Sequence, residues 1–230
     1  MPRPLFQLGP RLQTCADMVR DCGCLGDIGT DHALLPVWLL KKGRIKRAIA
    51  SDIREGPLQS AMENAGRYRV QPLLETRISN GLSGFEADEV DEIVIAGMGG
   101  ELILEIINAA MWLKSPGKHL VLQPMSMERE LRLGLRSMGF EIAEERAVED
   151  AGRIYSVMSV EYTGVSGELS ITEEYIGKLK AGEKASTDYA EKVTGKLRKK
   201  AEGLRAGGKE NESQRLFQAV LEIQKEFDIV

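Results

Sequence analysis

The segment LGDIGTDH, residues 25–32, is the stretch that decides the fold class. A short apolar run ends at Ile28, and Gly29 stands where the following helix-compatible stretch begins. Glycine has no Cβ, so a ligand can approach the backbone closely at the carboxyl end of a strand, where an open α/β sheet binds its cofactor. The segment therefore predicts an α/β fold with a nucleoside cofactor beside Gly29.

Seven short β-rich runs, this one included, alternate with helix-compatible stretches up to residue 162. They cover residues 25–28, 48–51, 77–79, 93–96, 119–122, 142–146 and 154–161. Such alternation predicts a parallel sheet covered by helices on both faces. Only short turn material separates the last two runs, which predicts an antiparallel hairpin. Seven strands ending in a hairpin are typical of the class I, Rossmann-like methyltransferase sheet, and an ordinary dinucleotide-binding sheet lacks that hairpin.

The composition changes after Gly164, where strand formers become rare and Glu, Lys, Ala and Gln dominate. We expect a methyltransferase domain at residues 1–164 and a coiled-coil-like helical hairpin at residues 165–230, interrupted at Gly207-Gly208. The expected apolar faces contain Tyr189, Val193, Leu197 and Leu204, then Phe217, Val220, Leu221 and Phe227. Glycines at positions 177, 182, 195 and 203 argue against long uninterrupted helices, because glycine is a poor helix former.

The composition excludes several classes of protein. The chain has 230 residues, 43% of them hydrophobic, which allows one α/β core plus a small extension. Its three cysteines are closely spaced and odd in number, so neither a disulfide framework nor a zinc site is expected. No signal peptide or membrane span is visible, which predicts a cytoplasmic protein. The lack of a CxxC pair or a second Cys/His cluster predicts that no metal is bound. The net charge of −4 requires any nucleic-acid contact to be sought in local clusters.

The polar residues near the strand ends indicate which cofactor is bound. Asp52 ends the second run at about the distance from Gly29 where an acid accepts hydrogen bonds from ribose hydroxyls. Asn80 and Gly81 follow the third run, where Asn80 can meet the adenine of a cofactor. The turn after the first run lacks a second and third glycine and carries Asp31, which disfavours a diphosphate. An anionic turn instead suits S-adenosylmethionine, which carries an ammonium group and a positive sulfonium.

Several motifs together resemble the bacterial tRNA adenine N1-methyltransferases that act on position 22 of tRNA. These motifs are Leu8-Gly9-Pro10-Arg11-Leu12, DIGTDHALLP (27–36), Glu55-Gly56-Pro57 with Ser60-Ala61, RISNGL (77–82), IAGMGGELI (95–103), LQP (122–124) and Glu149-Asp150 followed by Tyr155. The resemblance covers residues 5–162 strongly and the tail more loosely. It departs at Asp52, where the family usually has glutamate, and at Asn80, where aspartate is expected.

The resemblance implies transfer of a methyl group from S-adenosylmethionine to ring nitrogen N1 of an adenine in tRNA. Such a displacement needs alignment more than a base, because N1 already has a lone pair, while a nearby carboxylate can offset the positive charge of the product. The catalytic candidates are therefore Asp31 and His32; either side chain could alternatively serve the turn or the cofactor. The cofactor-binding candidates are Asp27, Gly29, Asp31, Asp52, Asn80, Gly81 and Gly97.

The substrate-binding candidates lie in three places. Met98, Gly99 and Gly100 follow the fourth run, where amino-directed adenine methyltransferases carry an Asn/Asp-Pro-Pro-aromatic segment, and glycines there would let a flipped base come close. Arg11 belongs to the first motif of the resemblance. Asp150 and Tyr155 are secondary candidates, and His119 is expected to be structural. The basic stripe Lys196, Arg198, Lys199 and Lys200 predicts contacts with the tRNA backbone.

Three other functions remain open at the level of the sequence. The chain could methylate another RNA or a small molecule with the same fold. It could be a nicotinamide-dependent oxidoreductase, although the missing glycines disfavour that interpretation. It could also be a non-catalytic RNA-binding protein that acts through its helical hairpin, and the expected assembly is a monomer or a weak dimer through that hairpin.

Overall fold

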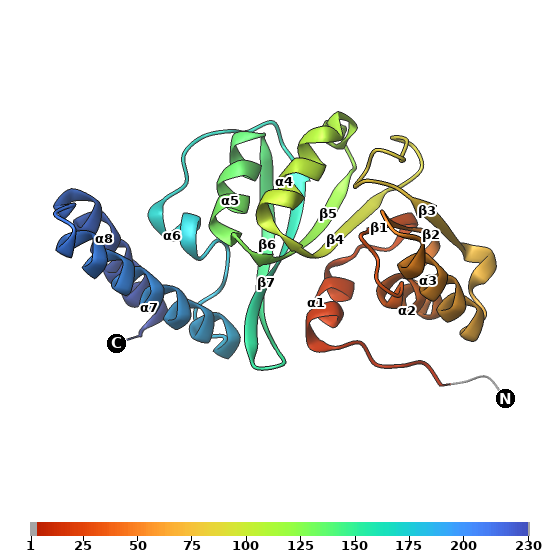
Figure 1. The fold of residues 1–230 in the computed structure, drawn as a ribbon, viewed down its shortest axis with the longest axis horizontal. Coiled ribbons are helices and arrows are strands. Elements are labelled where there is room, and N and C mark those ends of the chain that lie inside the picture. Colours follow the sequence, from red (N-terminus) through yellow and green to blue (C-terminus); the bar gives the residue numbers. More distant parts are fainter. Residues whose placement is uncertain (1–3, 230) are drawn as a thin grey trace.

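The fold is a seven-stranded mixed sheet with helices on both faces and a helical pair at one end (Figure 1), described here by a computed structural model of residues 4–229. The first three residues of the expected methyltransferase domain and Val230 of the expected extension lie outside the described residues. The strands are β1 (Cys22–Ile28), β2 (Ile45–Asp52), β3 (Leu74–Ile78), β4 (Glu92–Gly99), β5 (His119–Ser126), β6 (Phe140–Asp150) and β7 (Arg153–Tyr162).

The strand order β3-β2-β1-β4-β5-β7-β6 confirms the predicted class I arrangement. The first five strands in this order are parallel, and β7 runs antiparallel to both β5 and β6. The order reverses where β1 lies between β2 and β4, so the turns after these strands meet at the carboxyl edge where such sheets bind ligands. The third strand lies at 74–78 rather than at 77–79, because its polar LETRI sequence at the sheet edge has little apolar signal.

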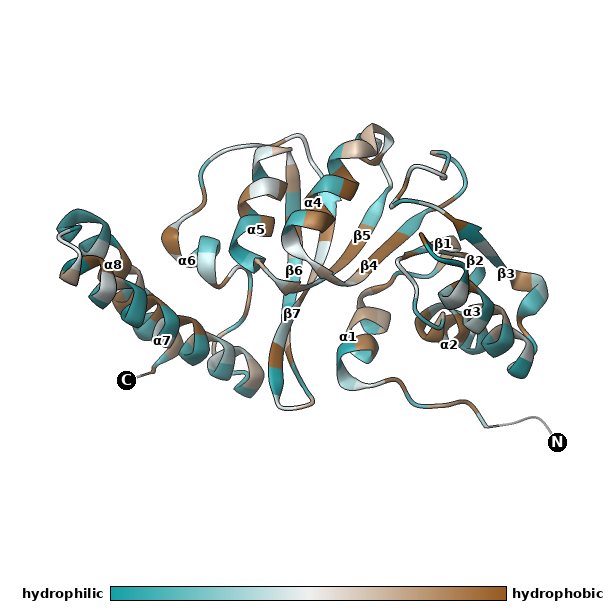
Figure 2. Cartoon of the chain, in the orientation of Figure 1, coloured by the Kyte–Doolittle hydropathy of each residue, from teal (hydrophilic) through white to brown (hydrophobic). Residues whose placement is uncertain are grey.

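Helices cover both faces of the sheet and enclose two cores. One face carries α1 (Pro10–Met18), α2 (Leu34–Lys42) and α3 (Glu55–Arg67), and the other carries α4 (Gly100–Ala109) and α5 (Glu128–Ser137). Short 3₁₀ helices, Gln71–Leu73 and Met111–Lys114, precede β3 and β5. Apolar residues run along β4 and β5 between the two layers (Figure 2), which accounts for their near-continuous hydrophobic sequences.

The hairpin of β6 and β7 turns at Ala151 and Gly152. Their φ angles are +50° and +72°, as a two-residue type I′ turn requires. Asp150 and Arg153 are paired on either side of the turn. The tip of this hairpin projects beyond the sheet (Figure 1), and its strands contact α1 as well as α7.

The extension consists of α6 (Ile171–Tyr175), α7 (Lys184–Ala206) and α8 (Glu210–Phe227). The glycines do not shorten α7 as expected, since Gly195 and Gly203 both lie inside this helix, where an apolar seam packs against α8 and outweighs their poor propensity. Among the predicted apolar positions, Leu221 is wrong, because it is 61% exposed while its neighbour Val220 is buried. Figure 2 shows mostly hydrophilic residues on the outer faces of the two helices.

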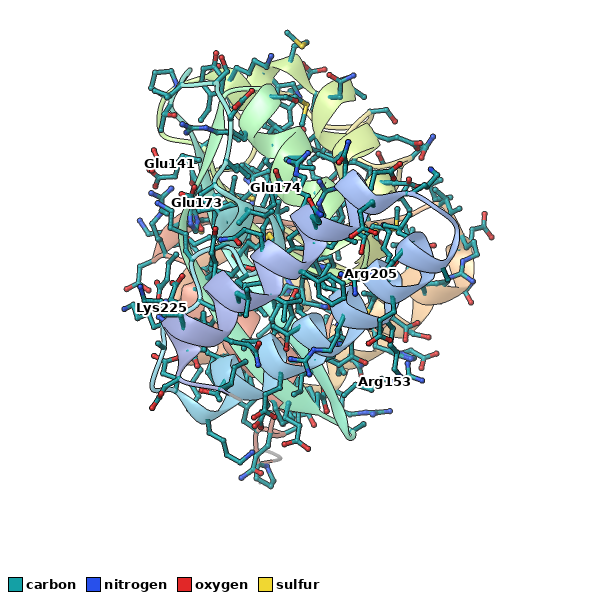
Figure 3. All side chains as sticks on the ribbon, turned by 90° about the vertical axis from the view of Figure 1, so that its left-hand side faces the viewer. Glu141, Arg153, Glu173, Glu174, Arg205 and Lys225 are labelled. Carbon is teal, nitrogen blue, oxygen red and sulfur yellow. The ribbon has the colours of Figure 1, made fainter. Side chains whose placement is uncertain are left out.

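A buried polar network joins the extension to the sheet. Arg132 of α5 donates to the Glu145 carboxylate at 2.6 Å and to the hydroxyl of Tyr189 in α7 at 3.3 Å. Arg132 also donates to the carbonyl of Tyr175 at 2.9 Å, and all three side chains of the network are buried. Figure 3 looks onto α7 and α8 from this end of the molecule and labels Glu174 beneath them, which accepts from Arg129 of α5 at 2.6 Å. The extension is therefore fixed to the sheet by buried charge as well as by apolar packing.

Candidate active site

The turn between β1 and α2 is held by backbone hydrogen bonds to the neighbouring strand. The N–H groups of Gly29 and Thr30 both donate to the carbonyl of Ser51 at 2.8 Å. Gly29 has a φ of +74°, and a Cβ at this position would overlap the Cε atom of Met98. The Thr30 hydroxyl accepts from the N–H of Ala33 at 3.0 Å, just before α2. Both the positive φ and the contact with Met98 therefore favour glycine at position 29.

A cavity of about 390 Å³ opens at this turn. It lies between α1, the β1–α2 turn and the end of β4. The residues lining it are Arg11, Leu12, Asp27, Gly29, Thr30, Asp31, His32, Ala33, Leu34, Leu35, Ala96 and Gly97. The structure therefore brings together six of the predicted site residues, namely Arg11, Asp27, Gly29, Asp31, His32 and Gly97.

The carboxylates of the cavity differ in their environments. Asp27 is buried at the end of β1, and this burial raises its pKa from 3.8 to about 6, with an opposing hydrogen bond from Thr30. Asp31 stands at the mouth with 82% of its side chain exposed, 3.3 Å from the Nε2 atom of His32. Asp27 thus provides a confined acidic group, whereas Asp31 and His32 can meet a ligand arriving from solution.

The other predicted cofactor residues lie at the adjacent strand ends and do not line this cavity. Asp52 is 9% exposed and accepts from the N–H of Arg54 at 2.9 Å and from its guanidinium at 3.3 Å. Both bonds engage Oδ1, so Oδ2 can accept from another donor. Asn80 is exposed in the turn after β3, and Gly81 has a φ of +57°, with Ile106 2.8 Å from the position of a Cβ.

The β4–α4 turn contains a β-bulge and three glycines with different roles. Gly97 has a φ of +82°, lies at the register shift between Ala96 and Met98, and lines the cavity. A Cβ on Gly100 would overlap the carbonyl oxygen of Met127, so this glycine allows α4 to pack against the β5–α5 turn. Gly99 has more room, with the Ser126 hydroxyl 3.5 Å from a Cβ position. Met98 packs against the core, and its Cε atom occupies the place where Gly29 would carry a Cβ.

Gln123 is a site residue that the sequence prediction missed. Its side chain is completely buried in β5, and its Oε1 atom accepts from the Arg11 guanidinium at 2.6 Å and from the Gly97 N–H at 3.1 Å. Its Nε2 atom donates to the Pro124 carbonyl at 2.6 Å. Gln123 thereby fixes both the β4–α4 turn and one wall of the cavity. The available signal was a lone amide side chain within the apolar run HLVLQP.

Comparison with known proteins agrees with this geometry. A family model described as a methyltransferase domain matches residues 8–158. The tRNA (adenine(22)-N(1))-methyltransferase of Bacillus subtilis is 32% identical over 168 residues, which are 70% of this chain and 71% of that protein. The chain belongs to the tRNA (adenine(22)-N(1))-methyltransferase family.

Two solved structures cover nearly the whole chain. A candidate tRNA (m1A22) methyltransferase of Streptococcus pneumoniae, solved in complex with S-adenosyl-L-methionine, has 34% identity and a TM-score of 0.75 and covers 94% of this chain and 98% of its own. A protein of the NADB-Rossmann superfamily from Streptococcus agalactiae has 32% identity and a TM-score of 0.83, over 97% and 98% of the two chains. The likeness therefore includes the helical extension.

The cavity of this tRNA methyltransferase family member fits S-adenosylmethionine as its cofactor. Gly29 and Gly97 line the cavity with backbone alone, and Asp27 and Asp31 supply negative charge for an ammonium or sulfonium group. A nicotinamide cofactor would need donors for a diphosphate at this turn, where Asp31 would repel it. Over residues 4–229, no cluster of three His, Cys, Asp or Glu side chains could hold a metal ion.

The remaining predicted residues lie away from this cavity. Lys196, Arg198, Lys199 and Lys200 are all exposed on α7, and Arg198 donates to Gln224 of α8 at 3.2 Å. His119 is buried at the start of β5 between Glu92 at 2.5 Å and Ser159 at 2.7 Å, which agrees with a structural role.

Two further properties concern the chain as a whole. Cys15, Cys22 and Cys24 are free thiols. Within the described part of the chain, no helix is both long and apolar enough to span a membrane.

Proposed function

We propose that this protein methylates ring nitrogen N1 of an adenine in tRNA, at position 22, and uses S-adenosylmethionine as methyl donor. The observation that carries this proposal is the cavity at the β1–α2 turn, where two carboxylates and two positive-φ glycines meet in a chain of this family. The cofactor supplies a methyl group on a positively charged sulfur. The protein has to hold that methyl group in line with N1 and keep water away.

Asp27, Asp52 and Asn80 are proposed to hold the cofactor. Asp27 is confined at the end of β1, so its carboxylate suits the ammonium group of the methionine part. The Oδ2 atom of Asp52 is free to accept from the ribose hydroxyls, while Arg54 fixes Oδ1. Asn80 and Gly81 lie in the turn after β3, at the same edge of the sheet, where they can contact the adenine of the cofactor.

Asp31 and His32 are the proposed catalytic residues. They stand together at the mouth of the cavity, 3.3 Å apart, on the side open to an incoming base. Because N1 becomes cationic as the methyl arrives, the Asp31 carboxylate can lower the energy of the developing charge without moving a proton. Gly97, Met98 and Gly99 form the turn after β4, where the two glycines leave room for the base to approach.

The extension is proposed to dock the tRNA. Lys196, Lys199 and Lys200 are exposed on a helix that the Arg132–Glu145 pair and Tyr189 anchor to the sheet. A charged helix held at a fixed place relative to the cavity can position a long substrate through its phosphates. The polar outer surface and the buried anchor of the extension, residues 165–229, support this role.

The test is incubation of the protein with methyl-labelled S-adenosylmethionine and unmodified bulk tRNA, followed by mass spectrometry of the nucleosides. We expect labelled 1-methyladenosine, lost when position 22 of the tRNA is not adenine. Label on another nucleoside or only on a small molecule would contradict the proposed substrate. Cofactor affinity without any transfer to RNA would instead favour the non-catalytic RNA-binding alternative.

A further inference from the structure

A second cleft lies next to the cofactor cavity, where β5 and β7 separate. These strands are hydrogen-bonded only where His119–Leu122 faces Met158–Glu161. Beyond this ladder the carboxyl end of β5 and the amino end of β7 part, and they leave a cleft of about 340 Å³. This volume is within the range of roughly 300–1,000 Å³ found for small-molecule sites. We call this space the β5–β7 cleft.

The β5–β7 cleft adjoins the cofactor cavity through Arg11 and Tyr155. Tyr155 lines the cleft, and the Arg11 guanidinium lies 5.9 Å from the centre of its ring. Arg11 also lines the cofactor cavity, where Gln123 fixes it at 2.6 Å. A substrate with one base beside Arg11 at the cavity mouth would therefore bring its neighbouring nucleotide to Tyr155.

The side chains around the cleft match the parts of a nucleotide. Tyr155 is partly exposed and Met125 is 39% exposed, so an aromatic ring and a thioether are available for stacking on a base. Arg153 points to the same side of β7 as Tyr155, because the two residues are two positions apart on a strand. Glu128, from the first turn of α5, is the carboxylate of the cleft and can accept from an amino group of a base.

Cations from two elements gather at the rim of the cleft. Arg153 lies at the start of β7 (Figure 3), and Lys192 comes from α7, with its Nζ atom donating to the Ile154 carbonyl at 2.9 Å. The pKa of Lys192 is lowered by burial and by the nearby charges of Lys196 and Arg153, whereas Glu128 opposes this shift. Mutual repulsion of these cations would be relieved by a phosphate, and the rim continues into the basic stripe of α7.

We infer that the β5–β7 cleft binds the nucleotide next to the methylated adenine, with its base stacked on Tyr155 and its phosphate between Arg153 and Lys192. This inference rests on the proposed methylation of tRNA and adds a subsite to it. The subsite would hold the flanking nucleotide while the target base turns toward the cofactor. Tyr155 is thus a substrate-binding residue, and its partner Arg11 connects the two pockets.

The experiment combines variants of the full-length protein with altered tRNA. Tyr155→Leu removes the ring, and Tyr155→Phe keeps it. We expect Tyr155→Leu to raise the KM for tRNA about tenfold, the size of effect that loss of base–aromatic stacking produces, and Tyr155→Phe to resemble the wild type. The affinity for S-adenosylmethionine and the melting temperature should not change in either variant.

An abasic nucleotide beside the target adenine provides the decisive comparison. If Tyr155 stacks on that base, an abasic site on one side of the target should impair the wild type and add little to the defect of Tyr155→Leu. Arg153→Ala should also raise the KM, unlike Lys46→Ala, which removes an exposed cation from β2, separated from β7 in the sheet by β1, β4 and β5. Independent effects of Tyr155→Leu and of abasic sites on either side, or weakened cofactor binding by Tyr155→Leu, would overturn the subsite.

The wild-type protein separates this inference from the proposed function. Wild-type methylation of N1 with independent variant effects overturns the cleft assignment alone. A wild-type protein that binds S-adenosylmethionine but never methylates tRNA overturns the proposed function, and the subsite with it.

Discussion

The turns of the cofactor cavity and the α7–α8 extension achieve their proposed roles by different physical means. The turns depend on backbone conformation, since Gly29 and Gly97 have positive φ angles and the buried Gln123 holds the second turn in place. The extension depends on exposed charged side chains, such as Lys196 and Lys199, on a firmly anchored helix. A single substitution in the turns should therefore weaken cofactor binding strongly, by the same factor at low and high salt. Substitutions on the extension should each weaken tRNA binding a little, and salt should reduce their effect.

The largest effect is expected from Gly29→Ala. A Cβ there combines a φ of +74° with overlap on Met98 Cε, so either Met98 or the turn held by Ser51 must move. We expect the affinity for S-adenosylmethionine to fall by at least about a hundredfold, equivalent to about 2.7 kcal/mol, when measured by calorimetry. The loss should be the same at low and high salt.

Gly43→Ala is the matched control for this variant. Gly43 has a similar φ of +69°, but no atom lies within 4 Å of its Cβ position. This variant should lower the unfolding free energy by about 1–2 kcal/mol and leave cofactor affinity unchanged. Truncating Met98 in the double variant Gly29→Ala/Met98→Ala should recover part of the affinity. If Gly29→Ala binds cofactor as the wild type does, the cavity is not the cofactor site.

The next effect concerns the basic stripe. Reversal of Lys196, Arg198, Lys199 and Lys200 to glutamate should weaken tRNA binding by on the order of a hundredfold at low salt and flatten its salt dependence. Cofactor affinity should be preserved. The control reverses Lys41, Lys42, Lys46 and Arg47, which are equally exposed but lie on α2 and β2. Equal losses in both variants would show that only net charge matters and would exclude docking on α7.

Charge reversal is a cleaner test of the extension than its removal. Deleting the chain after Gly164 would expose Arg132 and Glu145, which are buried in part by Tyr189, along with Ala147 and Ile154 of the hairpin. A truncated protein could then lose activity because its sheet edge is damaged.

The sequence predicted the fold well because its signals were local. The central strands β1, β4 and β5 contain short apolar runs, and the hairpin is marked by Ala151-Gly152 between two strand-like segments. The signals failed where tertiary packing decides the outcome. Gly195 and Gly203 remain helical because α7 packs against α8, and the edge strand β3 begins three residues earlier than its weak pattern suggests.

The site was predicted less completely than the fold. The turn residues Gly29 and Gly97 were found because positive-φ glycine positions are recognisable in a motif. The role of Gln123 was missed, since it depends on bonds to Arg11, 112 positions away in the chain. Tyr155 was a secondary candidate, but the β5–β7 cleft itself was not predicted, because it exists only where two strands distant in the chain separate.

Asp52→Ala tests whether the strand end beside the cofactor cavity binds the ribose of the cofactor. The variant removes the proposed acceptor of the ribose hydroxyls, so S-adenosylmethionine should bind about tenfold to a hundredfold more weakly by calorimetry. Asp52→Glu, which has the longer side chain usual in the family, should retain most of the affinity. Unchanged binding by Asp52→Ala, with an intact circular dichroism spectrum, would place the ribose elsewhere.

Asp27 should make cofactor binding depend on pH. Its raised pKa of about 6 means that the carboxylate is ionised above that pH and becomes neutral as the pH falls through it. If the carboxylate holds the ammonium group, affinity should be full near pH 8 and decline up to about tenfold per pH unit below 6. Asp27→Asn should bind weakly at all these pH values with a flat profile. The same slope in this variant would assign the titration to another group.

Asp31→Asn is expected to have the smallest effect on binding and distinguishes two proposed roles of that carboxylate. Asp31 is largely exposed beside His32 at the cavity mouth, whereas the confined Asp27 is better placed for the ammonium group. We therefore expect cofactor affinity to change less than about threefold and the single-turnover methylation rate to fall about tenfold, as for loss of charge stabilisation in the transition state. The amide keeps the size of the side chain and removes only its charge. A raised dissociation constant with an unchanged rate at saturating cofactor would instead make Asp31 the ammonium anchor, and wild-type values in both measurements would reduce it to a turn residue.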